Sequence, residues 1–149
     1  MNAAAFLTDL KVLDITEGKE TSTLQLMADF RVYSGVLDAI VSVPAGFVCD
    51  GESIPLCVQW VAPPFGLSRR AAFVHDYLYR NRGYYDATVG FHPVTRTQAD
   101  AVYRELCEAK GLSSWRSNVR WAVLRLVGWK AWNDDSRQHE APQPPTTRL

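Results

Sequence analysis

Short apolar runs alternate with turn-forming residues in the first half of the chain, a pattern that predicts β-strands. Four such runs stand out, at residues 11–15, 23–33, 39–43 and 46–49. Glycine and proline between the runs favour turns, so we expect a small and largely antiparallel β region. Two segments rich in breakers, 50–55 and 62–66, then predict loops.

Apolar residues recur with the helical period from Ser68 onward. The pattern predicts three helices, at residues 68–80, 95–111 and 113–132. Thr95 and Gln98 have the spacing of a capping box, which marks the start of the second helix. The connection between the first two helices, residues 81–94, is long for a plain link and predicts a hairpin or a flap.

Strands that precede helices are typical of an α+β domain. We expect a small antiparallel β region followed by three helices, of which the first two pack as an antiparallel pair. Residues 1–132 would form this single domain, because a chain of 149 residues that is 47% hydrophobic has enough material for one core. Residues 133–149 are rich in proline and predict a tail that is flexible or bound to a partner.

Charge and cysteine content exclude several classes of protein. Sixteen basic residues balance sixteen acidic ones, so no net positive field favours nucleic acid and no such partner is expected. The three cysteines, Cys49, Cys57 and Cys107, form no Cys-x-x-Cys pair and are expected to be thiols in a reducing compartment. The first ten residues lack the basic and apolar segments of a signal peptide, which predicts a cytosolic protein.

The candidate chemistry lies on the first two helices. His75 and Tyr79 are spaced i, i+4 and share a helix face, whereas Asp76 points about a quarter turn away. If the two helices are antiparallel, Asp100 of the second helix reaches the ring of His75. A carboxylate that orients an imidazole is the arrangement of a general base near neutral pH, and His75 would then activate water. The alternative is that the two residues merely satisfy each other between helices.

These residues resemble the helix pair of secreted phospholipase A of the sn-2-specific type. That family carries His-Asp-x-Cys-Tyr on one helix and Cys-Asp on the next, and here the matching segments are residues 75–79 and 99–100. The resemblance implies that His75 activates water, that Tyr79 and Asp100 support His75, and that Asp76 holds calcium. The family's glycine-rich calcium loop is absent, so Asp50 would have to complete the calcium site.

The cystines of that family are also missing. Leu78 and Ala99 stand where the family has one disulfide, and Ala71 and Leu106 stand where it has a second. Apolar pairs at both places fit a cytosolic version of the same packing.

A longer stretch, from Phe47 to Trp132, resembles a family of small uncharacterised proteins encoded by bacteriophages and prophages. Its motifs are Asp-Gly-x-Ser-x-Pro, His-Asp-x-x-Tyr and a segment ending in aspartate, found here at 50–55, 75–79 and 96–100. This resemblance supplies no reaction. It implies a phage origin, with synthesis in the host cytoplasm and the virion as a second location to consider.

Two further residues widen the choice of site. Ser53 could be a nucleophile, with His75 as its base and Asp100 as the orienting carboxylate. Ser53 lacks the Gly-x-Ser-x-Gly elbow that exposes a nucleophile, which favours a plain loop role. His92 could join His75 as a zinc ligand, but no closely spaced ligand pair supports such a site.

The third predicted helix has a pattern of its own. Its apolar residues fall on one stripe, made of Trp115, Val119, Ala122, Leu126 and Trp129. Its charged residues are all basic, namely Arg116, Arg120, Arg125 and Lys130. A basic helix with tryptophans can lie on an anionic bilayer. The alternative is that the stripe packs on the core and the arginines are solvated.

Three functions stay open at the level of sequence. The first is a phage-encoded hydrolase-like protein, a phospholipase-like esterase that uses His75, Asp100 and Tyr79, with calcium at Asp76 and Asp50 and a phospholipid membrane surface as partner. The second is a virion or tail-assembly component without activity, bound to other virion proteins. The third is a cell-wall hydrolase. A site open to solvent favours an enzyme, and a closed cluster favours the structural role.

Overall fold

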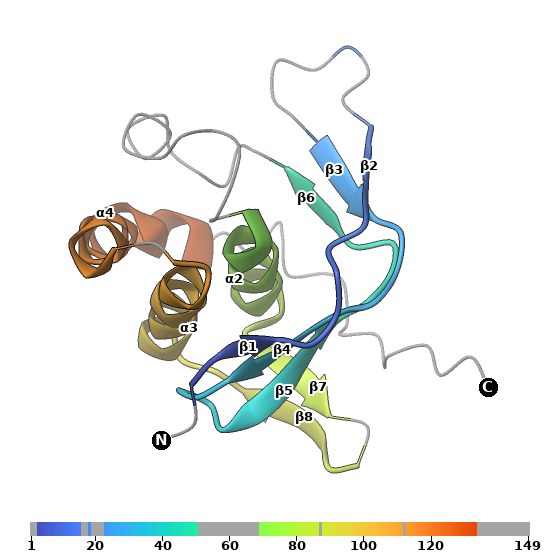
Figure 1. Ribbon diagram of the computed structural model, residues 1–149, viewed down its shortest axis with the longest axis horizontal. Helices are drawn as coiled ribbons and strands as arrows, with labels where there is room; N and C mark the ends of the chain where they lie inside the picture. Colours follow the sequence, from blue (N-terminus) through green and yellow to red (C-terminus); the bar gives the residue numbers. More distant parts are fainter. Residues whose placement is uncertain are drawn as a thin grey trace.

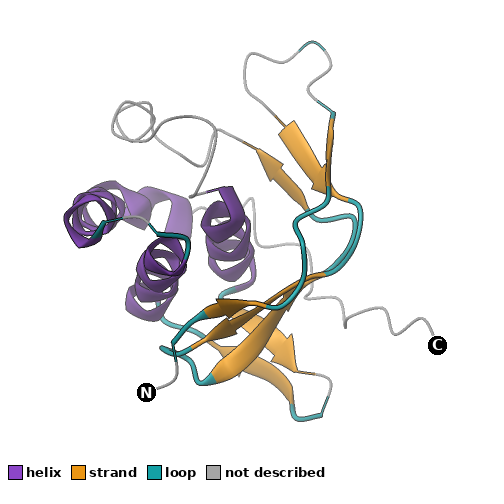
Figure 2. Cartoon of the chain, in the orientation of Figure 1, coloured by secondary structure: helices purple, strands orange, loops and turns teal. Residues whose placement is uncertain are grey.

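The predicted α+β class is confirmed by the computed structural model, which describes residues 3–15, 18, 23–50, 69–86, 88–111 and 113–133. Small antiparallel sheets are followed by helices, which pack together on one side of the molecule (Figures 1 and 2). The helices are α2 (Arg69–Asn81), α3 (Arg96–Ala109) and α4 (Ser114–Trp132). The predicted cap at Ser68, the loop at 62–66, nearly all of the loop at 50–55 and the tail beyond Asn133 lie outside the described residues.

Two small antiparallel sheets form the β region. One sheet has the order β1 (Ala5–Phe6), β4 (Phe30–Ser34) and β5 (Ala39–Val43). The other has the order β2 (Val12–Asp14), β3 (Thr23–Leu26) and β6 (Val48–Asp50). Buried residues alternate along β4, where Val32 pairs with Val41 and Phe30 pairs with Val43 of β5. The apolar face made by these pairs packs on α2 and α3.

The run predicted as one strand at residues 23–33 is two strands in different sheets, so the prediction is wrong at its centre. Asp29 lies at the break. Its carboxylate accepts a hydrogen bond from the backbone N–H of Ala45 at 2.8 Å, and its backbone carbonyl accepts one from the hydroxyl of Thr8 at 3.4 Å. These two hydrogen bonds to distant parts of the chain hold Asp29 where the chain passes from one sheet to the other.

The predicted start of the second helix is confirmed. The hydroxyl of Thr95 accepts a hydrogen bond from the backbone N–H of Gln98 at 3.2 Å, and the side chain of Gln98 accepts one from the backbone N–H of Thr95 at 2.9 Å. Gly111, with φ of 91°, follows the end of α3. No helix in the described ranges is long and apolar enough to cross a membrane.

The connection predicted as a hairpin or flap is a hairpin of β7 (Gly83–Asp86) and β8 (Gly90–Pro93). Asp86 holds its turn, because its carboxylate accepts hydrogen bonds from the backbone N–H groups of Thr88 at 2.7 Å and Val89 at 3.2 Å. A Cβ on Gly83 would lie 2.2 Å from the carbonyl oxygen of His92, so the tight pairing requires glycine. The hairpin returns the chain so that α3 runs antiparallel to α2, as predicted.

A single apolar core joins the sheets to the helices. Phe30, Val32 and Val41 from the strands meet Phe73 and Leu78 of α2 in this core. The helices are also tied to the sheet by a polar contact. Glu105 of α3 accepts hydrogen bonds from the hydroxyl of Ser34 and from the backbone N–H groups of Gly35 and Val36, at 3.1 and 3.2 Å for the two backbone groups.

Candidate functional site

His75 and Asp100 form the centre of the candidate site. His75 lies in the middle of α2 on the face turned toward α3, and Nε2 of its ring is 2.9 Å from Oδ1 of Asp100. This contact between the two helices was predicted from the sequence and is confirmed. The side chain of Asp100 is fully buried, whereas 12% of the His75 side chain is exposed.

Tyr79 supports the same carboxylate oxygen. Its hydroxyl donates a hydrogen bond of 2.5 Å to Oδ1 of Asp100, one helical turn beyond His75. The rings of His75 and Tyr79 are also in contact, with centroids 4.1 Å apart. Burial raises the pKa of the Tyr79 phenol, and the hydrogen bond to Asp100 raises it further, so Tyr79 stays a donor throughout the neutral range.

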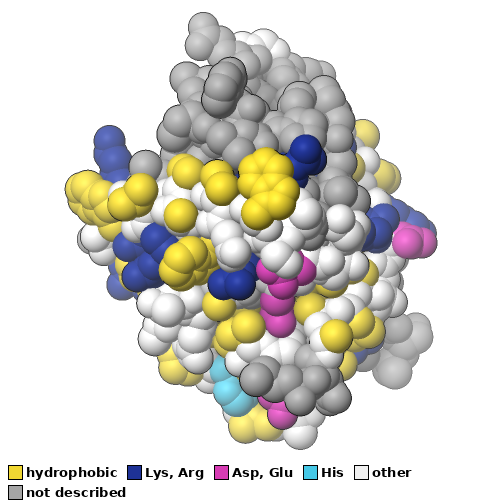
Figure 3. Space-filling view, turned by 60° about the vertical axis from the view of Figure 1, so that its left-hand side comes forward, with side chains coloured by type: hydrophobic (Ala, Val, Ile, Leu, Met, Phe, Trp, Pro, Cys, Tyr) yellow, Lys and Arg dark blue, Asp and Glu magenta, His cyan; other side chains and the backbone are white. Residues whose placement is uncertain are grey.

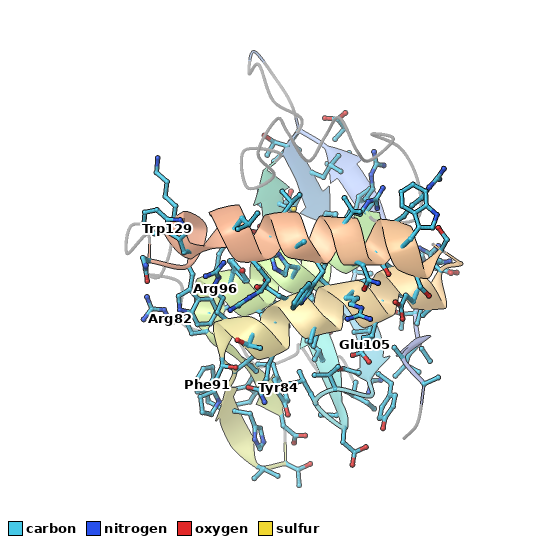
Figure 4. The ribbon with its side chains drawn as sticks, turned by 90° about the vertical axis from the view of Figure 1, so that its left-hand side faces the viewer. Arg82, Tyr84, Phe91, Arg96, Glu105 and Trp129 are labelled. Carbon is cyan, nitrogen blue, oxygen red and sulfur yellow. The ribbon has the colours of Figure 1, made fainter. Side chains whose placement is uncertain are left out.

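Two arginines bind the other oxygen of Asp100, and sequence reasoning missed both. Nη1 of Arg125, on α4, lies 3.2 Å from Oδ2 of Asp100, and Nε of Arg96, on α3, lies 3.8 Å from it. Arg96 also donates to the backbone carbonyls of Leu124 and Arg125, at 2.9 and 2.5 Å. Figure 4 shows Arg96 in the layer between α3 and α4, where it joins the two helices at the level of Asp100.

These partners fix the charge of Asp100. Burial raises its pKa, but the hydrogen bond and charge of His75, with the hydrogen bonds from Tyr79 and Arg125, outweigh burial and hold the pKa below its ordinary value. Asp100 is therefore ionised at neutral pH and can only accept hydrogen bonds. The neutral imidazole of His75 then carries its proton on Nε2, which leaves Nδ1 as the basic nitrogen.

Aromatic rings surround this pair. The ring of Tyr103, on α3, meets the ring of His75 edge to face at a centroid distance of 5.3 Å. Trp132, at the end of α4, meets the ring of Tyr79 in the same way at 5.2 Å. Such packing fixes the orientation of the imidazole and lowers the local dielectric constant, which strengthens its interaction with Asp100.

Asp76 is buried beside the site but is already paired. Its Oδ2 lies 3.0 Å from Nη2 of Arg80 on the next turn of α2. Arg80 in turn donates to the backbone carbonyl of Val48 at 2.8 Å and lies over the ring of Phe47. In the metal role predicted for Asp76, the cation would therefore share the carboxylate with Arg80.

The residues that the structure describes do not fit a calcium site. No three His, Cys, Asp or Glu side chains come together within the described ranges. Calcium needs six or more oxygen ligands, and the guanidinium of Arg80 already compensates the charge of Asp76. Asp50 belongs to β6, but its side chain lies outside the described part of the chain.

Comparison with known proteins adds one finding. A family model described as protein of unknown function (DUF1353) matches residues 24–124, more than half of the chain. The chain belongs to the DUF1353 family. No curated protein and no solved structure matches it significantly. The DUF1353 match includes His75, Tyr79 and Asp100 and ends one residue before Arg125, so the site lies almost wholly inside the family region.

The other residues predicted for the site of this DUF1353 protein either lie apart from His75 and Asp100 or fall outside the residues that the structure describes. Ser53 and Cys57 fall in segments that the structure does not describe. His92 stacks on Tyr84 of the hairpin at 5.1 Å, and it is not part of the His75 network. Cys49 and Cys107 are thiols rather than cystines, which confirms the prediction for both.

One further residue was misread from the sequence. Arg120 of α4 was expected to be solvated if the stripe packed on the core, but it is only 2% exposed. It lies against Tyr103 and Cys107, and its charge lowers the pKa of both groups, against burial, which raises it. Within the described part of the chain, its Nε and Nη1 have no hydrogen-bond partner. The burial of Arg120 could not be predicted from the sequence, because a long amphipathic side chain such as arginine occurs at both buried and exposed helix positions.

Proposed function

We propose that this chain is a hydrolase-like protein in which His75 activates water for attack on an ester. The single observation that supports this most is the hydrogen bond from Nε2 of His75 to the ionised, fully buried Asp100. That bond fixes the tautomer and keeps Nδ1 basic, as a general base requires.

The reaction follows from the same geometry. Nδ1 of His75 takes a proton from water, and the hydroxide equivalent attacks the ester carbonyl carbon to form a tetrahedral intermediate. The carbon–oxygen bond to the alcohol then breaks, and the imidazolium returns its proton to the departing oxygen. The products are a carboxylic acid and an alcohol. Asp100 stabilises the imidazolium while it exists, because it is an ionised carboxylate in contact with Nε2.

Tyr79, Arg96 and Arg125 act in this proposal as positioning residues. Tyr79 and Arg125 each bind one oxygen of Asp100, so the carboxylate cannot rotate away from the imidazole. Arg96 fixes α4 against α3 at that level. With His75, Tyr79 and Arg125 also keep Asp100 ionised, which a buried carboxylate would otherwise resist.

The substrate class is proposed from the resemblance to secreted phospholipase A. The His-Asp contact between two antiparallel helices and the support by Tyr79 agree with the roles that this resemblance implies. We therefore propose a phospholipid ester as the substrate and a phage as the source. The calcium role of Asp76 and Asp50 stays a prediction, since the side chain of Asp50 lies outside the described residues. A cell-wall substrate is the alternative within the same reaction class.

A second candidate is a virion or tail-assembly component in which these residues are structural. The observation that favours it is burial: Asp100 is fully enclosed, and four side chains from three helices contact its carboxylate. In that role the network would hold α2, α3 and α4 together, and His75 would contribute to stability alone.

The two candidates are separated by His75→Gln, since glutamine can keep one hydrogen bond but cannot take up a proton. The matched control is His92→Gln, on the hairpin away from Asp100. Release of fatty acid from mixed micelles of phosphatidylcholine and detergent, and release of fragments from purified peptidoglycan, would be measured with the melting temperature. We expect His75→Gln to lose about a hundredfold to ten-thousandfold of the activity with little change in melting temperature.

The hydrolase proposal fails if wild type is inactive on both substrates, or if His75→Gln and His92→Gln are equally active. A large fall in melting temperature for His75→Gln in an inactive protein would instead support the structural candidate.

A further inference from the structure

The apolar stripe of α4 faces solvent instead of the core. Trp115 is 63% exposed, Leu126 is 75% exposed and Trp129 is 55% exposed. Val119 and Ala122 complete the stripe and are exposed as well. Figure 4 shows Trp129 projecting from α4 on the side away from α3. The alternative that this stripe packs on the core is therefore wrong.

The opposite side of α4 is the one that packs on the domain. Ser117, Arg120, Leu124 and Gly128 are buried there. They recur every three or four residues, which is the spacing of a helix face, and the exposed stripe has the same spacing about half a turn away. The large apolar residues of the stripe therefore lie on the side of α4 that packing within the domain leaves exposed.

The charged residues of α4 itself are all positive. Arg116 and Lys130 are exposed next to it, and Arg116 lies over the ring of Trp115 at 5.3 Å. The sequence of α4 contains no acidic residue. Figure 3 shows hydrophobic side chains next to Lys and Arg side chains on the part of the surface that includes α4. A partner for this face must therefore be apolar in its centre and negative at its edges.

From this surface we propose that the outer face of α4 docks on an anionic lipid bilayer. A second copy of the chain is a poorer partner, because two such faces would bring Arg116 and Lys130 of each copy together without an acidic residue from α4 between them. An anionic bilayer offers acyl chains to the stripe and negative headgroups to the basic residues at once.

The arrangement of the tryptophans suits a helix that lies parallel to the membrane. Trp115 and Trp129 stand near the two ends of the stripe, and fourteen residues of helix place them about 21 Å apart. Indole rings favour the boundary between headgroups and acyl chains, where the apolar body is buried and the N–H stays hydrated. With a tryptophan toward each end, both ends of the helix can be held at the same depth.

This proposal does not depend on the proposed reaction. The exposed stripe contributes no side chain to the His75 network. The contacts from α4 to that network come through Arg125, Trp132 and the backbone carbonyls of Leu124 and Arg125. Docking and hydrolysis can therefore fail separately. If both hold, the same helix places a phospholipid surface next to the site.

The test is partition of the full chain onto vesicles, followed by sedimentation and by tryptophan fluorescence. We expect binding to vesicles of phosphatidylcholine with one-third phosphatidylglycerol, weak binding to phosphatidylcholine alone, and loss of binding as salt is raised. The double variant Leu126→Ser with Trp129→Ser should lower the partition coefficient roughly a hundredfold. Its matched control is Met27→Ser with Val89→Ser, two residues that are similarly exposed but lie on the β side.

The charge requirement has its own pair of variants. Lys130→Glu should lower partition at least about fivefold. Lys11→Glu makes the same change in net charge at an exposed position away from α4. It should change the partition coefficient by roughly twofold or less, because only the screened long-range effect of net charge is altered. His75→Gln should bind vesicles like wild type, which separates docking from hydrolysis.

The proposal is overturned if wild type does not bind the anionic vesicles, or if it binds phosphatidylcholine alone equally well. It is also overturned if the double variant on α4 binds as well as its control on the β side, or if Lys11→Glu loses as much as Lys130→Glu. Self-association of the chain that is abolished by the α4 variant, without vesicle binding, would assign this face to a second copy instead.

Discussion

The hydroxyl of Tyr79 lies directly against Gly128: a Cβ on Gly128 would stand 2.8 Å from that oxygen and 3.5 Å from Nη2 of Arg96. Glycine inside a helix costs about 1 kcal/mol relative to alanine. This close approach explains why α4 has glycine at position 128: only a residue without a side chain lets α4 pack on the hydroxyl of Tyr79, which supports Asp100. The support of the His75–Asp100 pair thus depends on a residue without a side chain.

Gly128→Ala should therefore destabilise the protein, although the same change in a helix usually stabilises it. We expect a loss of about 1–3 kcal/mol, because the added methyl group overpacks the space beside Tyr79. Chemical denaturation would measure it. The matched test is Gly128→Ala in a Tyr79→Phe background, where the clashing hydroxyl is gone and most of the added cost should disappear. Equal costs in both backgrounds would show that Gly128 does not act through Tyr79.

Asp100→Asn should cost about 3–5 kcal/mol at neutral pH, because it removes the buried charge that compensates Arg96 and Arg125. The folded pKa of Asp100 lies below its ordinary value of 3.8. The stabilisation is therefore fully present above pH 4 and is lost as the pH falls through the depressed folded pKa. Denaturation at pH 7 and at pH 3 would check the sign. A gap between wild type and variant that widened at low pH would contradict the assignment.

Arg125→Met should lower stability by about 1 kcal/mol and lower activity as well, because Asp100 loses a partner on Oδ2 while remaining bound to His75. The side chain of Arg125 is one-third exposed, which limits the cost. Arg116→Met on the same helix is the matched control, since Arg116 contacts Trp115 and not the network. Thermal melts and hydrolysis rates of the two variants should differ; indistinguishable variants would remove Arg125 from the site.

Calcium should not stabilise the wild-type protein. Asp76 is paired with Arg80 at 3.0 Å, so calcium would compete with a guanidinium for a buried carboxylate. We expect the melting temperature to be the same in millimolar calcium and in chelator, and Asp76→Asn to behave likewise in both. A calcium-dependent rise in the melting temperature of wild type that Asp76→Asn abolishes would restore the metal role of Asp76, because a ligand that binds only the folded state stabilises it.

Local patterns predicted much of this structure. The capping box at Thr95, the hairpin between α2 and α3 and the contact between His75 and Asp100 all depend on spacing within one or two elements. The break at Asp29 was missed because Met27 and Phe30 continue an apolar run, and only the hydrogen bond to Ala45, sixteen residues away, shows where the chain turns. β1, with two residues, is too short for any periodic signal.

The support of the site could not be predicted in the same way. Arg125 reaches Asp100 across twenty-five residues, and no pattern in α4 distinguishes it from the exposed Arg116. The contact of Arg96 with Asp100 could have been predicted, since Arg96 lies four residues before Asp100 on the same helix face. Which side of α4 faces the domain was also undetermined, because both of its sides carry apolar residues and only tertiary packing selects one.

The protonation state of His75 tests the central claim without knowledge of the substrate. Nitrogen NMR of the protein labelled with ¹⁵N at histidine, with His75→Gln used to assign the signals, distinguishes the two ring nitrogens. In the neutral imidazole, we expect the proton of His75 on Nε2 and a bare Nδ1, because Nε2 faces Oδ1 of Asp100. A proton on Nδ1 and a bare Nε2 would contradict the assignment of His75 as a general base oriented by Asp100.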